Sequence, residues 1–516
     1  MKTKPPPLPR PEAAGPKTTT GGLHHVTAIT RRVQANVDFY VGFLGLRLVK
    51  RTAGFEDAQQ LHLFYGDATG APGTLITFLV WEGGAPGRVG LGQIAELAVS
   101  VPQDSIGDWL TRALAAGVPV RGPERAFGET LLRLKDPDGI TVKLVGGKGP
   151  MRLHSVLLLS DQPAQTAAFL APFGYRAGLA EGAVQRLVSA HDVIDIRAAA
   201  GFVPGIPGTG TLDHLALRLP DEAALARAET ALRDGAGLVS ARKNRKYFTS
   251  LYTREPGGVL AELATDTPGM GVDEPAETLG QTLFLPPHAR ENAADLAVQL
   301  PQFAQPGEDR LPMRNLPFEH RFHHPDEPDG SVLVLLHGTG GNEADLMPLA
   351  HRIAPRATLL GVRGRSHEEG VARWFRRLSM AQFDQADIRT EAEAFAAFIE
   401  GAVSGYGLDA ARLTCLGYSN GANFITAVMG LSPQLIRRAI LLRAMPALDP
   451  LPMADLAGMR VLMLNGAQDP YGQFGPALAD WLQASGALLD ARVLPAGHAL
   501  VQADMEIARD WLAATG

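Results

Sequence analysis

A serine set between small residues is the first candidate for chemistry in this sequence. Residues 417–421 read GYSNG and place Ser419 between an apolar, strand-like run and a helix-forming stretch. Such a sharp turn strains the serine backbone, so the neighbouring residues must be small. Asp469 follows a later apolar run, and His498 precedes the last helix-forming segment. We expect His498 to take the proton of Ser419 and Asp469 to hold the histidine tautomer.

A Gly-rich loop supplies the remaining part of this candidate site. The run LLHGTGGN, residues 335–342, continues the first apolar strand of the second half into a loop. Backbone N–H groups in such a loop stabilise the oxyanion that forms during attack on an ester. We assign the oxyanion hole to the backbone N–H groups of Thr339 and Asn420. The order serine, acid, histidine, together with this loop, predicts a serine hydrolase.

Two histidines and a carboxylate form a second candidate site in the first half. Residues 21–265 repeat one pattern four times, in which a strand and a helix precede two or three strands. Aligning the repeats places His25, His214 and Glu262 in one set of matching positions. Two imidazoles and one carboxylate leave open positions on a metal for oxygen and substrate. This set is typical of Fe(II), and the same ligands could also hold Mn(II), or Zn(II) in a lyase or isomerase.

The other matching set consists of Ser155, Glu96 and Lys143. It cannot form a good metal site, because an ammonium group takes the place of a ligand. We therefore predict a structural ion pair between Glu96 and Lys143. We interpret His62 and His154 as structural residues as well.

The repeated βαβββ units resemble the vicinal-oxygen-chelate superfamily, which includes glyoxalases and extradiol dioxygenases. The resemblance implies an α+β fold in which pairs of units form cupped sheets, one of which holds the metal. We expect the first pair within residues 21–148. We expect the second pair, with a trailing arm, within residues 149–303.

The closest resemblance within that superfamily is to ring-cleaving dioxygenases of the hydroquinone type. It rests on the stretches LHHVTAIT, DFYVGFLGLRLVKRT, LHLFYGDATGAPGT, RKNRKYF and GGVLAE. It implies Fe(II) on the His, His, Glu set, with dioxygen as co-substrate. It also implies supporting roles for His24, for Arg245 beside a substrate phenolate, and for Tyr252 beside the hydroxyl or the oxygen. Some relatives carry a histidine directly before the ligand that matches His214, and Asp213 in its place would alter proton transfer and the preferred ring substituents.

From about residue 316 the pattern changes to near-continuous apolar strands that alternate with long helices. This pattern predicts a mostly parallel sheet covered on both faces. Residues 318–516 resemble the small phospholipase/carboxylesterase group of α/β-hydrolases. Only residues 446–458 separate two of the expected strands, which leaves no room for a large helical cap. Carbon–carbon hydrolases of ring-cleavage pathways usually carry such a cap, so we expect an ester, thioester or lactone as substrate rather than a vinylogous diketone. We expect Trp374 and Phe375 either in the acyl pocket or in the core.

Composition sets limits on the rest of the molecule. The chain has 516 residues and a net charge of −6, which argues against nucleic acid as a partner. Cys415 is the single cysteine, expected in a buried strand, and this usage suits a cytoplasmic protein. We expect a disordered Pro-rich arm over residues 1–20, a linker over 304–317 and no membrane-spanning segment.

The sequence thus predicts a bifunctional enzyme. The first half would open a hydroquinone-like aromatic diol, and the second would hydrolyse an ester-like compound in aromatic degradation or quinone detoxification. Two alternatives remain for the first half: a glyoxalase-like isomerase or lyase, and a catalytically inactive ligand-binding module. The substrates would be small molecules, and a homo-oligomer is compatible with the sequence.

Overall fold

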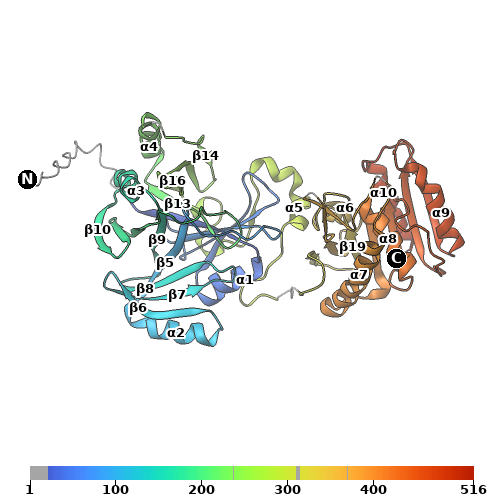
Figure 1. Cartoon of the computed structure of the whole chain (residues 1–516), viewed down its shortest axis with the longest axis horizontal. Coiled ribbons are helices and arrows are strands. Elements are labelled where there is room, and N and C mark those ends of the chain that lie inside the picture. Colours follow the sequence, from blue (N-terminus) through green and yellow to red (C-terminus); the bar gives the residue numbers. More distant parts are fainter. Residues whose placement is uncertain (1–20, 236, 310–313, 369, 380, 516) are drawn as a thin grey trace, which may run out of the picture. The chain divides into compact units, whose positions relative to one another are not determined.

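The computed structural model describes residues 21–235, 237–309, 314–368, 370–379 and 381–515 (Figure 1). They divide into two units, each described by itself below. The Pro-rich arm that we expected over residues 1–20 lies outside the described residues. No helix in the described ranges is long and apolar enough to cross a membrane.

Four repeats of a strand, a helix and three strands build the first unit, as the sequence predicts. The first repeat comprises β1 (Leu23–Thr30), α1 (Val33–Val37), β2 (Arg47–Ala53), β3 (Leu61–Gly66) and β4 (Leu75–Val80). The second comprises β5 (Ile94–Pro102), α2 (Ile106–Ala115), β6 (Val120–Ala126), β7 (Glu129–Lys135) and β8 (Thr141–Gly147). The third comprises β9 (Arg152–Ser160), α3 (Pro163–Leu170), β10 (Arg176–Glu181), β11 (Val184–Val188) and β12 (Val193–Ala198). The fourth comprises β13 (Leu212–Leu219), α4 (Glu222–Asp234), β14 (Lys243–Asn244), β15 (Phe248–Arg254) and β16 (Leu260–Pro268), and the short β17 (Leu283–Phe284) follows it.

The pairing of these repeats differs from our expectation that consecutive repeats share a sheet. Strand β1 pairs antiparallel with β13, and β5 pairs antiparallel with β9. One sheet therefore runs in the order β2-β3-β4-β1-β13-β16-β15-β14. The other runs in the order β6-β7-β8-β5-β9-β12-β11-β10. We call the sheet of the first and fourth repeats the outer cup and the sheet of the second and third repeats the inner cup.

Our prediction of which repeats share a sheet was wrong because the first strands of the repeats have similar edges, so more than one pairing is possible. Every residue of β1 is buried, as expected for a strand with neighbours on both sides and side chains covered on both faces. Strand β13 has the same character, with six of its eight residues buried. Periodicity identifies such strands, but the choice of partner depends on contacts between residues almost 200 positions apart, which no local pattern records.

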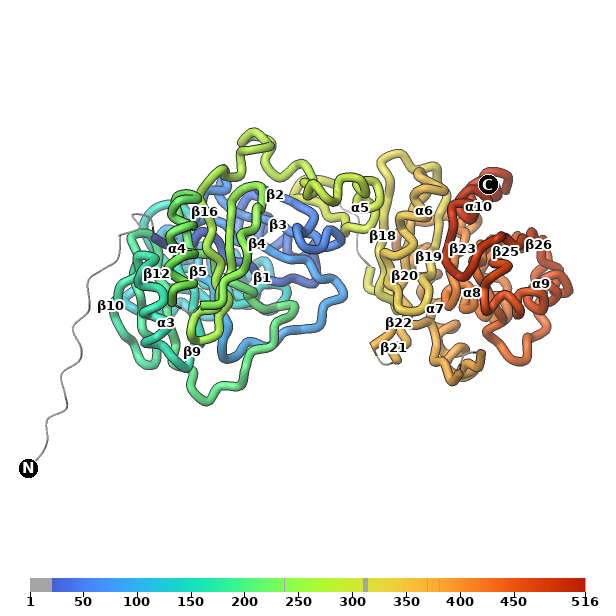
Figure 2. The backbone as a smooth tube through the Cα atoms, turned by 90° about the horizontal axis from the view of Figure 1, so that it is seen from above, coloured from blue at the N-terminus to red at the C-terminus, as the bar shows by residue number. Residues whose placement is uncertain are grey.

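The second unit is built on a seven-stranded sheet. Its elements are α5 (Ala293–Gln299), β18 (His320–His323), β19 (Val332–Leu336), α6 (Met347–Ile353), β20 (Thr358–Val362), β21 (Ser366–Glu368), β22 (Val371–Arg373), α7 (Gln385–Tyr406), β23 (Leu413–Tyr418), α8 (Asn420–Leu431), β24 (Arg438–Leu442), β25 (Arg460–Gly466), α9 (Gly475–Ala484), β26 (Leu488–Leu494) and α10 (Gln502–Thr515). The strand order is β18-β20-β19-β23-β24-β25-β26, and Figure 2 labels all of these strands except β24. Only β18 runs antiparallel to its neighbour in this sheet. The sequence HRFHHP, residues 320–325, clusters three histidines, of which His320 and His323 lie in this antiparallel edge strand and His324 follows it.

Helices cover both faces of this sheet, as its apolar strands predict. In β19, Val334 and Leu336 belong to the core that includes side chains of α7, α8 and α9, whereas Leu333 and Leu335 belong to the core that includes side chains of α6 and α10. Cys415 is fully buried in β23, as expected. Residues 443–459, between β24 and β25, contain no helix, so the predicted lack of a large cap is confirmed.

The segment after the fourth repeat is shared between the two units, unlike the single trailing arm that we expected. Residues Arg290–Gln302 belong to the second unit, where Val298 of α5 packs in the core beside Met347 of α6. Residues Phe303–Asp309 belong to the first unit, because the side chain of Gln34 makes two hydrogen bonds of 2.9 Å with the backbone of Ala304. Of the linker expected over 304–317, residues 310–313 lie outside the described residues.

Candidate active sites

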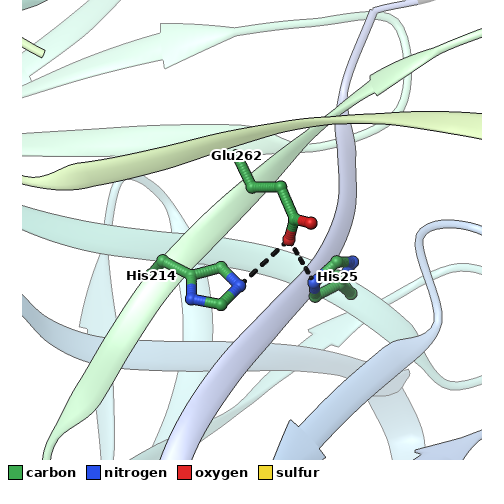
Figure 3. A group of neighbouring side chains, drawn as sticks. All are labelled: His25, His214 and Glu262. Carbon is green, nitrogen blue, oxygen red and sulfur yellow. Dashed lines mark hydrogen bonds and ion pairs between the residues drawn. The ribbon is translucent and has the colours of Figure 1, made fainter. Parts of the chain in front are cut away.

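Three side chains of the outer cup converge on one point (Figure 3). Nε2 of His25 lies 2.9 Å from Oε2 of Glu262, and Nε2 of His214 lies 3.0 Å from the same oxygen. One ligand atom from each residue lies within 4.8 Å of the others, and all three residues are buried. Oε1 of Glu262 is buried without a hydrogen-bond partner among the described residues. Two imidazole nitrogens and a carboxylate in this arrangement fit a divalent metal ion.

The strand register explains why these positions meet. In the parallel pair β13–β16, Glu262 lies beside Ala216, and in the antiparallel pair β1–β13, His25 also lies opposite Ala216. His214 precedes Ala216 by two residues and therefore points to the same face of the sheet. The pairing of the first and fourth repeats thus assembles the set, and no pairing of consecutive repeats would do so.

Neighbouring polar groups orient both histidines. Oδ2 of Asp213 lies 2.7 Å from Nδ1 of His214, which turns Nε2 of that ring toward Glu262. Burial lowers the pKa of His214, but its hydrogen bonds with Asp213 and Glu262 outweigh burial and raise the pKa to about 9. A carboxylate behind a ligating histidine fixes the tautomer of the ring and increases its basicity.

His24 contacts His25 directly, although adjacent strand residues normally point to opposite faces. The register of β1 is irregular between Leu23 and His25, and Nδ1 of His24 lies 2.9 Å from Nδ1 of His25. Burial and the neighbouring His25 lower the pKa of His24 to about 3, while a hydrogen bond to the backbone of Thr265 opposes this. A neutral His24 with its proton toward Thr265 can accept the Nδ1 proton of His25, which leaves Nε2 of His25 available as a ligand.

A cavity of about 280 Å³ opens above these ligands. Arg245 and Tyr252 line it, and Nη2 of Arg245 lies 3.4 Å from the Tyr252 hydroxyl. Burial, together with the charge of Glu262, raises the pKa of Tyr252, so this hydroxyl stays protonated and can donate a hydrogen bond. The structure places Asp213 in the cavity wall as well, whereas His24 lies behind His25.

The sequence did not identify several other residues of this cavity. His62, which we interpreted as structural, lines the cavity, and its Nε2 lies 3.0 Å from Oγ1 of Thr77. Glu56 lies in the wall and pairs with Lys243 at 2.6 Å and with Arg245 at 3.0 Å. His62 lies on a strand of a repeat that also carries a metal ligand, and this position could have suggested a place in the cavity. A single histidine on a strand is too common to support that prediction.

The inner cup carries an ion pair at the place that corresponds to the metal ligands. Glu96 precedes Ala98 by two residues, and Ala98 lies beside Lys143, which repeats the relation of His214 to Glu262. Nζ of Lys143 lies 3.2 Å from Oε2 of Glu96, so the predicted ion pair is confirmed. Ser155 lies opposite Ala98 and is fully buried.

We expect Lys143→Met to lower the free energy of unfolding of the first unit by about 2 kcal/mol, because Glu96 would remain largely buried with Arg133 as its one remaining ion-pair partner among the described residues. The double variant Glu96→Leu with Lys143→Met should recover most of this loss, since it buries no uncompensated charge. Urea unfolding followed by circular dichroism measures both. A double variant as unstable as the single one would contradict this account.

The second unit brings Ser419, His498 and Asp469 together. Nε2 of His498 lies 2.9 Å from Oγ of Ser419, and Nδ1 of His498 lies 2.8 Å from Oδ2 of Asp469. Asp469 is buried, which keeps its carboxylate directed at the imidazole. The geometry allows proton transfer from the serine to the histidine while the carboxylate holds the ring.

The backbone turn that presents Ser419 depends on small neighbours. Ser419 lies between β23 and α8 with a positive φ of 51°, a strained conformation for a residue with a side chain. A Cβ on Gly417 would lie 2.6 Å from the backbone nitrogen of Ala422, and a Cβ on Gly421 would lie 2.6 Å from the carbonyl oxygen of His337. Both positions therefore require glycine.

A cavity of about 340 Å³ surrounds the serine. Thr339 and Asn420, to which we assigned the oxyanion hole, both line it. Trp374 and Phe375 are fully buried and are not among its lining residues, so they belong to the core.

A buried arginine holds the loop that carries His498. Arg443 donates hydrogen bonds to the carbonyl oxygens of Gly497 and Ala499, at 3.0 and 3.1 Å, on either side of the histidine. It also forms a two-point ion pair with Asp504 at 2.8 Å, in which both side chains are completely buried. This clamp fixes the histidine relative to the serine.

We expect Asp504→Asn to lower the free energy of unfolding of the second unit by about 3 kcal/mol, because the Arg443 charge would remain buried and unpaired. Asp490→Asn is the matched control, since its pair with Arg492 is substantially exposed and should contribute less than about 1 kcal/mol. Urea unfolding of both variants measures the difference. Equal effects would show that the buried pair contributes no more than a surface pair.

Comparison with known proteins identifies the first unit. The family model of the glyoxalase/bleomycin resistance protein/dioxygenase superfamily matches residues 22–144. MhqO of Bacillus subtilis (strain 168), by name a provisional ring-cleaving dioxygenase, is 38% identical over 288 residues, which are 52% of this chain and 91% of MhqO. The chain belongs to this superfamily.

Two further relatives extend the comparison to both units. Chlorohydroquinone/hydroquinone 1,2-dioxygenase of Sphingobium indicum is 30% identical over 298 residues, which are 52% of this chain and 91% of that enzyme. MhqD of Bacillus subtilis, by name a provisional hydrolase, is 37% identical over 183 residues, which are 35% of this chain and 92% of MhqD. This superfamily member is therefore a ring-cleaving dioxygenase unit fused to a hydrolase unit, and the resemblances inferred from the sequence are confirmed.

Proposed function

We propose that the outer cup uses ferrous iron and dioxygen to open the ring of a hydroquinone-like aromatic diol. The convergence of His25, His214 and Glu262 on one point carries this proposal. Bound iron would let the diol and dioxygen exchange electrons while both are held at one centre. The name of the Sphingobium relative gives hydroquinones as its substrates, which supports this substrate class. Mn(II) is the alternative ion for the same ligands.

Residues of the cavity wall would bind and orient the diol. Arg245 pairs with a phenolate oxygen through its planar guanidinium. Tyr252 donates a hydrogen bond to the substrate hydroxyl or to the oxygen, as its raised pKa allows. Asp213 and His24 hold the two ligating rings.

The test is oxygen uptake by protein loaded with Fe(II) under anaerobic conditions and then given hydroquinones or catechols. Uptake with a hydroquinone, together with an open-chain product that contains both oxygen atoms, is the expected result. No uptake with any diol, despite bound metal, would favour the glyoxalase-like isomerase or the binding module. A stoichiometric metal content measured on the same sample separates that outcome from failed loading.

We also propose that the second unit is a serine hydrolase of esters, thioesters or lactones. Ser419 attacks the carbonyl carbon, His498 takes its proton, and the backbone N–H groups of Thr339 and Asn420 stabilise the oxyanion. The hydrogen bonds that link Ser419, His498 and Asp469 carry this proposal. Hydrolysis of 4-nitrophenyl esters and labelling of Ser419 by a fluorophosphonate probe test it. Protein that shows neither would not be a serine hydrolase.

The covalent link between the two units favours one pathway, either aromatic degradation or quinone detoxification. We propose that the hydrolase acts downstream of ring opening, on a small molecule derived from the product. Hydrolysis confined to compounds unrelated to ring-opened acids would contradict this link.

A further inference from the structure

The lining of the hydrolase cavity is rich in arginine. Its lining residues are Thr339, Arg373, Arg377, Phe383, Tyr418, Ser419, Asn420, Asn423, Arg443, Met445, Tyr471 and His498. Three of these are arginines and none is acidic, in the part of the chain that the structure describes. An esterase for plain fatty acyl groups needs an apolar acyl pocket, and only Phe383 and Met445 here are fully apolar.

We propose that the hydrolase is specific for esters that carry a free carboxylate, which Arg377 binds. This inference rests on the proposed serine hydrolase function of the same cavity and names its substrate class. It concerns the acyl substrate of the second unit alone.

The three arginines differ in how far their charges are compensated. Arg443 is fully buried and its charge is compensated by Asp504, so it is unavailable to a ligand. Arg373 donates a hydrogen bond of 3.2 Å to the Thr339 hydroxyl, and its Nε lies 3.6 Å from Glu368. Arg373 is therefore already held by groups of the second unit, next to the loop assigned to the oxyanion hole.

Arg377 provides the charge that remains. Its side chain is exposed to the cavity mouth and forms no ion pair with a described residue. Glu368 accepts a hydrogen bond of 3.0 Å from the backbone N–H of Arg377, not from its guanidinium. A guanidinium can bind a carboxylate through two parallel hydrogen bonds. A substrate carboxylate bound in this way would neutralise the charge of Arg377.

The cavity volume limits the substrate further. About 340 Å³ lies at the lower end of the range for small-molecule sites, so a short acyl chain fits within the cavity. Hydrolysis consumes one water, breaks the ester C–O bond and gives the proton of Ser419 to the leaving group through His498. The free carboxylate of the substrate does not react and serves only for binding.

The proposed first reaction would supply the free carboxylate of such a compound, while the ester or lactone would come from a substituent of the ring. Insertion of both atoms of dioxygen into a ring C–C bond beside a hydroxylated carbon leaves a carboxyl group at that carbon. At neutral pH this group is ionised, because a carboxylic acid has a pKa near 4. A ring-opened product that bears an ester or lactone elsewhere would therefore reach the hydrolase as an anion.

The test compares two esters of equal chain length on the full chain. Mono-4-nitrophenyl adipate carries a terminal carboxylate, and 4-nitrophenyl hexanoate ends in a methyl group. We expect kcat/KM for the adipate to exceed that for the hexanoate at least tenfold. Arg377→Gln should lower this ratio at least tenfold, mainly by raising KM for the adipate, and added salt should lower it as well.

Arg376→Gln is the matched control. Arg376 is the preceding residue, is also exposed, pairs with Asp384 at 3.2 Å and is not among the lining residues. In Arg376→Gln, the ratio of kcat/KM for the adipate to kcat/KM for the hexanoate should stay within twofold of the wild-type ratio. The rate of fluorophosphonate labelling of Ser419 in each variant reports whether the catalytic residues remain in place.

A wild-type protein that hydrolyses both esters at similar rates would overturn the anionic specificity and leave the serine hydrolase function intact. A preference for adipate that survives both Arg377→Gln and Arg377→Glu would overturn the role of Arg377. Protein that hydrolyses neither ester and is not labelled at Ser419 would overturn the hydrolase function, and this inference with it.

Discussion

Glu262→Ala is expected to abolish oxygen uptake with hydroquinones and to remove iron from the protein. Glu262 is the residue on which both histidines converge, at 2.9 and 3.0 Å. Its removal leaves two imidazole ligands, which cannot replace the lost anionic ligand in a buried site. Changes to residues behind the ligands typically cost about 10- to 100-fold in metal affinity, so loss of a ligand should cost more.

Two measurements on the same sample check this expectation. Metal analysis after gel filtration gives the iron content, and an oxygen electrode gives the uptake. The control is the double variant Glu96→Leu with Lys143→Met, which changes the equivalent place of the inner cup and should keep both iron and uptake. If the Glu262→Ala variant kept both its iron and its oxygen uptake, the iron would be bound at another site.

Ser419→Ala is expected to lower kcat for ester hydrolysis by at least about 10⁴-fold, because no other group can form the acyl intermediate. Asp469→Asn should cost about 10⁴-fold as well, since the histidine would adopt the wrong tautomer. Stopped-flow and steady-state hydrolysis of 4-nitrophenyl esters measure both losses. A Ser419→Ala variant with near wild-type turnover would assign the reaction to another nucleophile.

Two controls separate this result from loss of the fold. Cys415→Ala should keep full activity, because the Cys415 thiol is buried in β23 and burial raises its pKa to about 12. Oxygen uptake by Ser419→Ala should equal that of the wild type, because the serine belongs to the other unit. A change in uptake would indicate that the two proposed activities depend on each other.

Sequence reasoning succeeded where chemistry is tied to local spacing. The turn around Ser419 needs glycines at two positions within five residues, so GYSNG specifies the elbow before any tertiary contact forms. The repeat pattern gives equivalent positions at strand starts, so His25, His214 and Glu262 could be chosen without a structure. The Glu96–Lys143 pair followed from the same alignment.

Sequence reasoning failed where partners are chosen over long distances. The repeats have equivalent edges, and the pairing of β1 with β13 depends on contacts that periodicity does not encode. The irregular register between Leu23 and His25 brings His24 beside His25, although strand alternation predicts opposite faces. The division of residues 290–309 between the units was missed for the same reason.

The sequence by itself determined the four repeats, the covered parallel sheet, the lack of a large cap and the residue types of both candidate sites. These depend on hydrophobic periodicity and on short motifs, which act through neighbouring residues. Only the tertiary structure decided which repeats share a cup, that His62 lines one cavity, and that Arg373 and Arg377 line the other. A cavity wall is assembled from side chains on separate elements, and its charge is set by which ion pairs form, so it exists only once the chain has folded.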